Sequence, residues 1–181
     1  MRDSLVDTNN RKMCNISVDF EDLHFYSRTL GLSHQEKENS AYDKAIDRFI
    51  DLFQLMDIKG TFFLIGKDVL KAKDNREAVR RLSENGHEVA NHTMTHPFNF
   101  SRYSYQKKKD EILETGKMLE DITGKKVSGF RAPCYDIDEE IMDILQEAGY
   151  LYDSSVFPCY YKALQQLIYL LLCKGKYRRM G

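Results

Sequence analysis

The chain has 181 residues, with 27 basic and 28 acidic side chains and a formal net charge of -1. This length fits one domain with a buried core. The balanced charge gives no electrostatic basis for binding nucleic acid or an anionic membrane, so we expect neither as a partner.

The N-terminal segment and the cysteines bear on location. Residues 1–14 contain no apolar stretch typical of a secretory signal, and the longest apolar run, residues 163–173, is too short to span a bilayer. The four cysteines form no CxxC pair and no dense disulfide pattern, which favours a reducing compartment. The sequence therefore predicts a cytoplasmic protein without a transmembrane segment.

Short apolar runs alternate with helical patterns along the chain. In chain order we expect a strand at 15–20, a helix from 40 to 56, a strand at 61–65, a helix at 76–85, a strand at 88–91, a helix at 105–122, a strand at 127–130, a helix between 136 and 149 that is capped by Asp136 with Glu139, and a strand at 150–152. This alternation predicts an α/β domain. The domain is expected at 15–158 after an N-terminal extension (1–14), and residues 159–181 are expected to be an apolar and basic C-terminal segment of the same domain, cut short.

Four polar clusters stand where predicted strands end. They are DFED (19–22), NHTMTH (91–96), RAPCYD (131–136) and YDSS (152–155). Because the carboxyl ends of parallel strands share one face of a sheet or barrel, we expect the four clusters to converge.

Two of these clusters carry the residue types of a metal site. His92 and His96 are four residues apart, a spacing that suits two ligands of Zn²⁺. Asp19, Glu21 and Asp22 crowd three carboxylates together, which raises at least one pKa unless a cation neutralises them. Taken alone, the histidine pair is explained equally well by two hydrogen-bonded loop histidines, and the acidic cluster is better explained by a solvated acidic loop. Together they predict a centre of two histidines and one carboxylate with open positions for water and substrate.

The third cluster supplies two further groups. Arg131 at a strand end is expected to orient one of the carboxylates through a charge-assisted hydrogen bond. Pro133 fixes the turn that follows, and a rigid turn can direct a backbone N–H at an oxyanion.

Five segments then resemble one known family. VDFED, KGTFFLIG, GHEVANHTMTH, GFRAPCYD and YDSSVFP occur in this order over about residues 15–158. The chain resembles the polysaccharide deacetylase family, also called the NodB-homology domain or carbohydrate esterase family four. The resemblance implies a distorted (β/α) barrel that hydrolyses the N-acetyl group of a carbohydrate with a divalent metal, Zn²⁺ in the first place.

The resemblance also implies a role for individual residues. Asp19 matches the catalytic base, Arg131 the arginine that steers it, and His92 and His96 the metal histidines. Asp22 is slightly preferred as the metal carboxylate, with Glu21 kept open. The backbone N–H of Cys134 is expected to hold the oxyanion. The expected substrate-binding residues are Pro133, Tyr135, Asp153 and Ser155.

One family feature is missing from the sequence. The family supplies a general acid from a histidine in a late Leu-x-His segment, and no histidine follows His96 here. We therefore expect a barrel truncated at its C-terminal end, with weak or no turnover and self-association through the exposed barrel edge. An O-acetyl carbohydrate esterase and a catalytically inactive metal- or sugar-binding remnant stay open as alternatives.

Overall fold

A computed structural model describes residues 14–21 and 40–156 of the chain. In these residues five parallel strands form one sheet in the order β1-β2-β3-β4-β5, so that each strand pairs with the next one along the chain. The strands are β1 (Ile16–Phe20), β2 (Gly60–Leu64), β3 (Glu88–Asn91), β4 (Gly129–Phe130) and β5 (Tyr152–Asp153). The predicted α/β class with a parallel sheet is confirmed. The described sheet is open, with β1 and β5 at its edges, so barrel closure and C-terminal truncation stay predictions.

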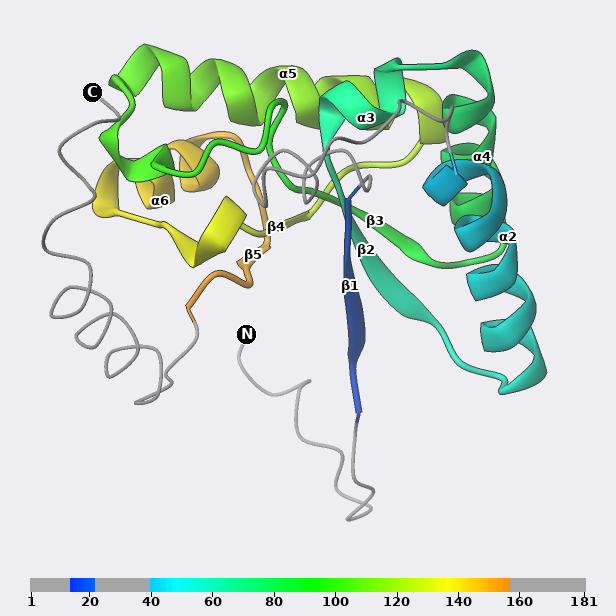
Figure 1. Ribbon diagram of the computed structural model, residues 1–181. Helices are drawn as coiled ribbons and strands as arrows, with labels where there is room; N and C mark the ends of the chain where they lie inside the picture. The colour runs from blue at the N-terminus through cyan, green and yellow to red at the C-terminus, as the bar shows by residue number, and fades with distance from the viewer. Residues whose placement is uncertain (1–13, 22–39, 157–181) are drawn as a thin grey trace, which may run out of the picture.

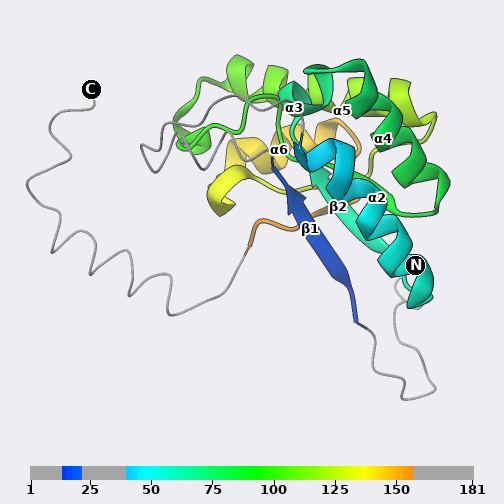
Figure 2. The same ribbon diagram turned by 45° about the vertical axis from the view of Figure 1, so that its right-hand side comes forward.

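The helices form an arc along one side of this sheet (Figure 1; Figure 2). They are α2 (Ser40–Leu55), α3 (Gly66–Leu70), α4 (Lys73–Glu84), α5 (Tyr105–Thr123) and α6 (Glu139–Glu147), with short 3-10 helices at η1 (Phe100–Arg102) and η2 (Pro133–Tyr135). Among the described segments, no helix combines the length and apolarity needed to cross a bilayer.

The main core lies between the first three strands and helices α2 and α4. Phe62 of β2 is fully buried, and the rings of Phe20, Phe49 and Phe53 lie 5.4 to 6.5 Å from its own ring. Edge-to-face and tilted pairs of this kind add to the stabilisation from burial alone. Strand β1 pairs with β2 in a register that sets Asp19 beside Phe63. Because the core packs against both strands, it fixes the position of Asp19 along the strand direction.

A second core joins β4 to α5 and α6. Its fully buried members include Phe100, Ile112, Phe130 and Ile141. At the ends of β3 and β4 the two strands are joined by a backbone hydrogen bond, in which Arg131 N–H donates to Asn91 O (3.0 Å). The residues that follow these two strands are therefore neighbours in space.

Most of the predicted elements are confirmed, and one predicted cap is wrong. The residue that caps α6 is Asp138, which accepts a hydrogen bond from Ile141 N–H, whereas Asp136 accepts one from Ser101 N–H. Helix α3 was not predicted, because its five residues are too few to show a helical period. Strands β4 and β5 have two residues each, shorter than expected. The predicted domain limits stay predictions, and residues 159–181 lie outside the described part.

Candidate metal centre and active site

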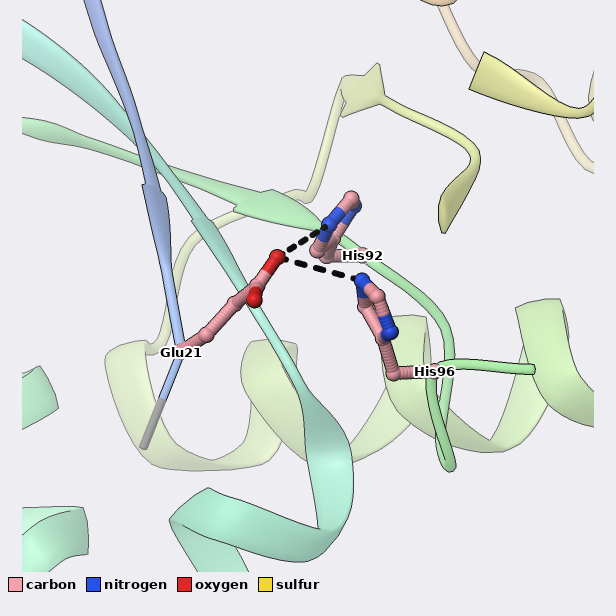
Figure 3. A group of neighbouring side chains, drawn as sticks. All are labelled: Glu21, His92 and His96. Carbon is pink, nitrogen blue, oxygen red and sulfur yellow. Dashed lines mark ion pairs between the residues drawn. The ribbon is translucent and has the colours of Figure 1, made fainter. Parts of the chain in front are cut away.

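Glu21, His92 and His96 come together at the carboxyl ends of β1 and β3. Glu21 Oε1 lies 3.1 Å from His96 Nε2 and 3.7 Å from His92 Nε2. One ligand atom from each of the three residues lies within 4.8 Å of the others. Figure 3 shows the Glu21 carboxylate directed at both imidazole rings. The side chains are almost fully enclosed, with 2%, 4% and 10% of His92, His96 and Glu21 exposed.

The His92 ring is held by its other nitrogen. Nδ1 lies 2.7 Å from Arg131 O, and a carbonyl oxygen can only accept a hydrogen bond, so Nδ1 carries the proton. The other ring nitrogen, Nε2, faces Glu21, where it carries a second proton in the imidazolium form and is the atom that would ligate a metal in the neutral form. Histidine ligands of metals commonly have this arrangement, because the second hydrogen bond fixes the tautomer and the ring plane.

The electrostatics of Glu21 fit a cation. Burial by itself raises the pKa of the Glu21 carboxyl, but the hydrogen bonds and charge of the two imidazoles outweigh it and lower that pKa from 4.5 to about 2. Glu21 Oε2 is buried and has no hydrogen-bond partner within the described residues. A buried anionic oxygen in this condition is costly unless a cation or water satisfies it. Two imidazole nitrogens and one carboxylate are also a donor set that Zn²⁺ accepts.

The loop that carries both histidines has an unusual backbone. Thr93 and His96 have positive φ angles of 66° and 53°, a conformation that a β-branched residue such as threonine seldom adopts. Three hydrogen bonds hold this loop in place. Asn91 Oδ1 accepts from Thr93 N–H (2.8 Å), Thr93 Oγ1 accepts from His96 N–H (3.1 Å), and Gly66 N–H donates to Thr93 O (3.0 Å). These bonds satisfy buried backbone groups that no strand or helix ladder pairs.

Asn91 links this loop to the rest of the domain. It is fully buried, and its Nδ2 donates to Ile112 O of α5 (2.8 Å) and to the Tyr150 hydroxyl (2.6 Å). One amide side chain therefore ties the end of β3, the histidine loop, helix α5 and the segment before β5 together.

Arg131 and Asp19 form the second part of the site. Arg131 Nη1 donates to Asp19 Oδ1 (2.6 Å), and Nη2 donates to Ser17 Oγ (3.0 Å) and Ser154 Oγ (2.7 Å). The guanidinium also lies 4.1 Å from the centre of the Phe63 ring. The expected contact of Arg131 with a carboxylate is confirmed. Because the guanidinium is held on several sides, Asp19 has one preferred orientation.

Residues of the fourth cluster brace the Arg131 segment. Ser155 is 1% exposed; its hydroxyl donates to Asp153 Oδ1 (2.6 Å) and accepts from Ala132 N–H (2.7 Å). Asp153 also accepts from Ser155 N–H. The Ser155 hydroxyl is buried and bonded within the chain, which favours a structural role, and its predicted contact with substrate stays a prediction. For Asp153, these two bonds favour bracing as well.

The predicted oxyanion segment is η2. Cys134 and Tyr135 have positive φ angles of 54° and 58°, and the residue before them is the buried Pro133. Cys134 is exposed, and the Tyr135 ring centre lies 5.9 Å from Arg131 Cζ. The segment thus borders the Arg131–Asp19 pair, while the individual roles of these three residues stay predictions. Asp22, the preferred metal carboxylate, lies outside the described residues.

The chain matches the family model described as polysaccharide deacetylase over residues 37–152. It belongs to this family. The resemblance inferred from the five segments is thereby confirmed.

Curated relatives of the chain include proteins described as peptidoglycan deacetylases. A peptidoglycan deacetylase of Helicobacter pylori is 26% identical over 116 residues, which are 64% of this chain and 38% of the relative. A peptidoglycan-N-acetylglucosamine deacetylase of Bacillus cereus is 33% identical over 101 residues, 56% of this chain and 45% of the relative. The matched part of the chain thus spans less than half the length of these relatives.

Solved structures show the same fold. A CE4 family pseudoenzyme from Bacillus anthracis superposes with a TM-score of 0.62 and 23% identity, over 80% of this chain and 43% of that one. A Bc1960 peptidoglycan N-acetylglucosamine deacetylase gives a TM-score of 0.56 and 24% identity, over 61% of this chain and 50% of that one. At these identities the likeness concerns the fold alone.

Three residues of the site were not predicted from the sequence: Asn91, Ser17 and Ser154. Ser17 shares the strand face of Asp19 and Glu21 by simple alternation, a signal that was available. Asn91 and Ser154 stand inside polar clusters that were recognised as groups, but no pattern distinguished them from their neighbours.

Proposed function

We propose that this site hydrolyses the N-acetyl group of an N-acetylated sugar or polysaccharide with a divalent metal ion, Zn²⁺ in the first place, held by Glu21, His92 and His96. The observation that carries the proposal is the meeting of these three side chains around one point, next to the Arg131–Asp19 pair. Asp19 and Glu21 lie two residues apart and therefore project from the same face of the extended chain.

Each protein group has a task in this reaction. When bound, the ion supplies a Lewis acid that polarises the acetyl carbonyl and activates water. Asp19 takes the proton of the attacking water while Arg131 holds the Asp19 carboxylate in place, and this proton passes to the amine nitrogen as the C–N bond breaks, which releases acetate and the free amine. The backbone N–H of Cys134 is assigned to the oxyanion that forms as the carbonyl carbon becomes tetrahedral.

The metal carboxylate is assigned to Glu21 and not to Asp22. Support comes from the short distances to both imidazoles and from the buried Oε2 that has no partner in the described residues. The test is Zn²⁺ titration calorimetry on metal-free protein, with Glu21→Gln and Asp22→Asn as a matched pair. Glu21→Gln is expected to lose most of the affinity and Asp22→Asn to keep it. The reverse ranking would transfer the assignment to Asp22, and absence of Zn²⁺ binding by the unaltered chain would refute the metal centre.

Polymers of N-acetylglucosamine are the first substrates to test, because several curated relatives are peptidoglycan or chitooligosaccharide deacetylases. Acetate release from a chitooligosaccharide and from peptidoglycan, with Zn²⁺ present, measures the activity. Asp19→Asn is expected to abolish release while Zn²⁺ affinity is kept. An acetylated xylan in the same panel distinguishes the O-acetyl esterase alternative.

A catalytically inactive metal-binding domain is the second candidate. It is a candidate because the proteins that share this fold include one described as a CE4 family pseudoenzyme. Zn²⁺ binding without acetate release from any of the three polymers would support it. Weak turnover and self-association stay predictions, and the same acetate assay and sedimentation velocity test them.

A further inference from the structure

Helix α5 places one acidic side chain against the histidine loop. Glu111 is 7% exposed, and both of its carboxylate oxygens bind the same residue. Oε2 accepts from Thr95 N–H (2.8 Å), and Oε1 accepts from the Thr95 hydroxyl (2.6 Å). Thr95 is the residue immediately before the proposed metal ligand His96.

Burial of the Glu111 carboxylate costs more free energy than a purely structural contact at this place would require. Removing a carboxylate from water costs much free energy unless its oxygens are well bonded. In the described residues no basic side chain forms an ion pair with Glu111, so its only polar compensation there is the pair of bonds from Thr95. Charge-assisted hydrogen bonds of this kind are short and strongly directional.

The two bonds restrict the backbone at Thr95. With its N–H and its hydroxyl held by one carboxylate, Thr95 cannot rotate without breaking at least one of them. These bonds fix the Thr95 side chain and the peptide between Met94 and Thr95. The next peptide is held by His96 N–H, which donates to Thr93 Oγ1 (3.1 Å), and His96 itself has a positive φ of 53°. This orientation sets His96 Nε2 3.1 Å from Glu21 Oε1.

The support behind Glu111 is rigid. Its own carbonyl accepts from the fully buried Thr115 hydroxyl (2.9 Å), and the next residue, Ile112, is fully buried in the second core. The carboxylate is thus carried by a packed helix and not by a loop.

We infer that Glu111 is a positioning residue, which holds His96 in the geometry for metal binding by clamping Thr95. The inference rests on the proposed metal centre but assigns a part to a helix residue outside the ligand set. Glu111 is expected to affect the affinity for the metal ion and the geometry of the ligands around it. Both can be measured without enzymatic turnover.

The test uses the whole chain and Glu111→Gln, which keeps the side-chain size. An amide offers one acceptor oxygen in place of two, so one Thr95 donor loses its acceptor. Loss of an outer partner of a metal histidine typically lowers metal affinity by about 10- to 100-fold, and we expect this for Zn²⁺ by calorimetry. The visible absorption of the Co²⁺-loaded protein should change as well, since it reports ligand geometry.

Three control variants separate positioning from simple destabilisation. Glu114→Gln changes an exposed glutamate of the same helix and should alter neither affinity nor spectrum. Ile141→Val, in the second core but on helix α6, should lower the melting temperature of the metal-free protein without changing Zn²⁺ affinity. Thr95→Ser keeps both donors and should retain the original affinity, whereas Thr95→Val should lower it.

The outcomes are distinct. Wild-type Zn²⁺ affinity in Glu111→Gln, or a lowered melting temperature as its only effect, would overturn the inference and leave the metal centre standing. If the unaltered chain binds no Zn²⁺ or Co²⁺, both the metal centre and the clamp are refuted.

Discussion

Replacement of Asn91 by alanine should cost more stability than any other single polar change near the site. The amide now accepts from Thr93 N–H and donates to Ile112 O, and both of these residues are fully buried. Without it the buried Thr93 N–H is left without this partner, at about 1–3 kcal/mol, whereas Ile112 O keeps the Tyr150 hydroxyl (3.5 Å) and loses one hydrogen bond worth about 1 kcal/mol net. The expected loss is therefore about 2–4 kcal/mol, a large part of the total stability of an ordinary domain.

Tyr150→Phe is the matched comparison. The Tyr150 hydroxyl is a third partner of Asn91, and burial raises the pKa of Tyr150 to about 12, so it stays protonated. Its removal takes away one hydrogen bond and leaves Asn91 Nδ2 bonded to Ile112 O, at a net cost of about 1 kcal/mol.

Urea unfolding with excess chelator measures both variants without a contribution from bound metal. A loss for Asn91→Ala no larger than that for Tyr150→Phe would refute the argument from unsatisfied buried groups.

Three further outcomes follow from the packing. Burial, and secondarily the charge of Lys59, lower the pKa of His87 below its usual 6.5. The unfolded chain therefore binds more protons there, and stability should be complete above about pH 6.5 and decline as the pH falls below it; urea unfolding of His87→Gln across this range should show a shallower decline. In Gly129→Ala the new methyl group would overlap the Tyr152 ring, so we expect a loss of about 1–3 kcal/mol that Tyr152→Ala in the same chain partly relieves, as thermal denaturation would show. Asp138→Ala removes the N-cap of α6, worth about 0.5–2 kcal/mol, and also one of the two carboxylates that pair with the buried Lys108, so the loss by the same measurement should exceed that of a cap alone; an unchanged melting temperature would contradict both roles.

The fold was largely predictable because its elements are marked by local chemistry. The run TFFLI, buried on every residue of β2, and the glycines that end helices α4 and α5 are signals that a single strand or helix provides by itself. Asp136 failed as a cap because a competing donor, Ser101 N–H, comes from a segment 35 residues away. No local pattern contains that information.

The candidate site follows the same division. His92, His96 and Arg131 were predicted because the carboxyl ends of parallel strands converge. Imidazole and guanidinium side chains at such positions are typical of metal ligands and of groups that orient a carboxylate. Glu21 was kept open beside Asp22, since spacing alone does not decide which carboxylate of a crowded cluster turns inward. Glu111 gave no signal, because its partner Thr95 lies on a loop that meets α5 only in three dimensions.

The bond between Arg131 and Ser17 has a geometric consequence. Arg131 follows β4 and Ser17 belongs to β1, and two other strands lie between them. On a flat sheet these strands would be about 14 Å apart, too far for a guanidinium to meet so short a side chain. The sheet must bend until its first and fourth strands face each other across a concave surface. The orientation of Asp19 by Arg131 therefore depends on the curvature of the sheet. A substitution that flattens the sheet would separate Arg131 from Asp19 and Ser17 without changing any of these residues.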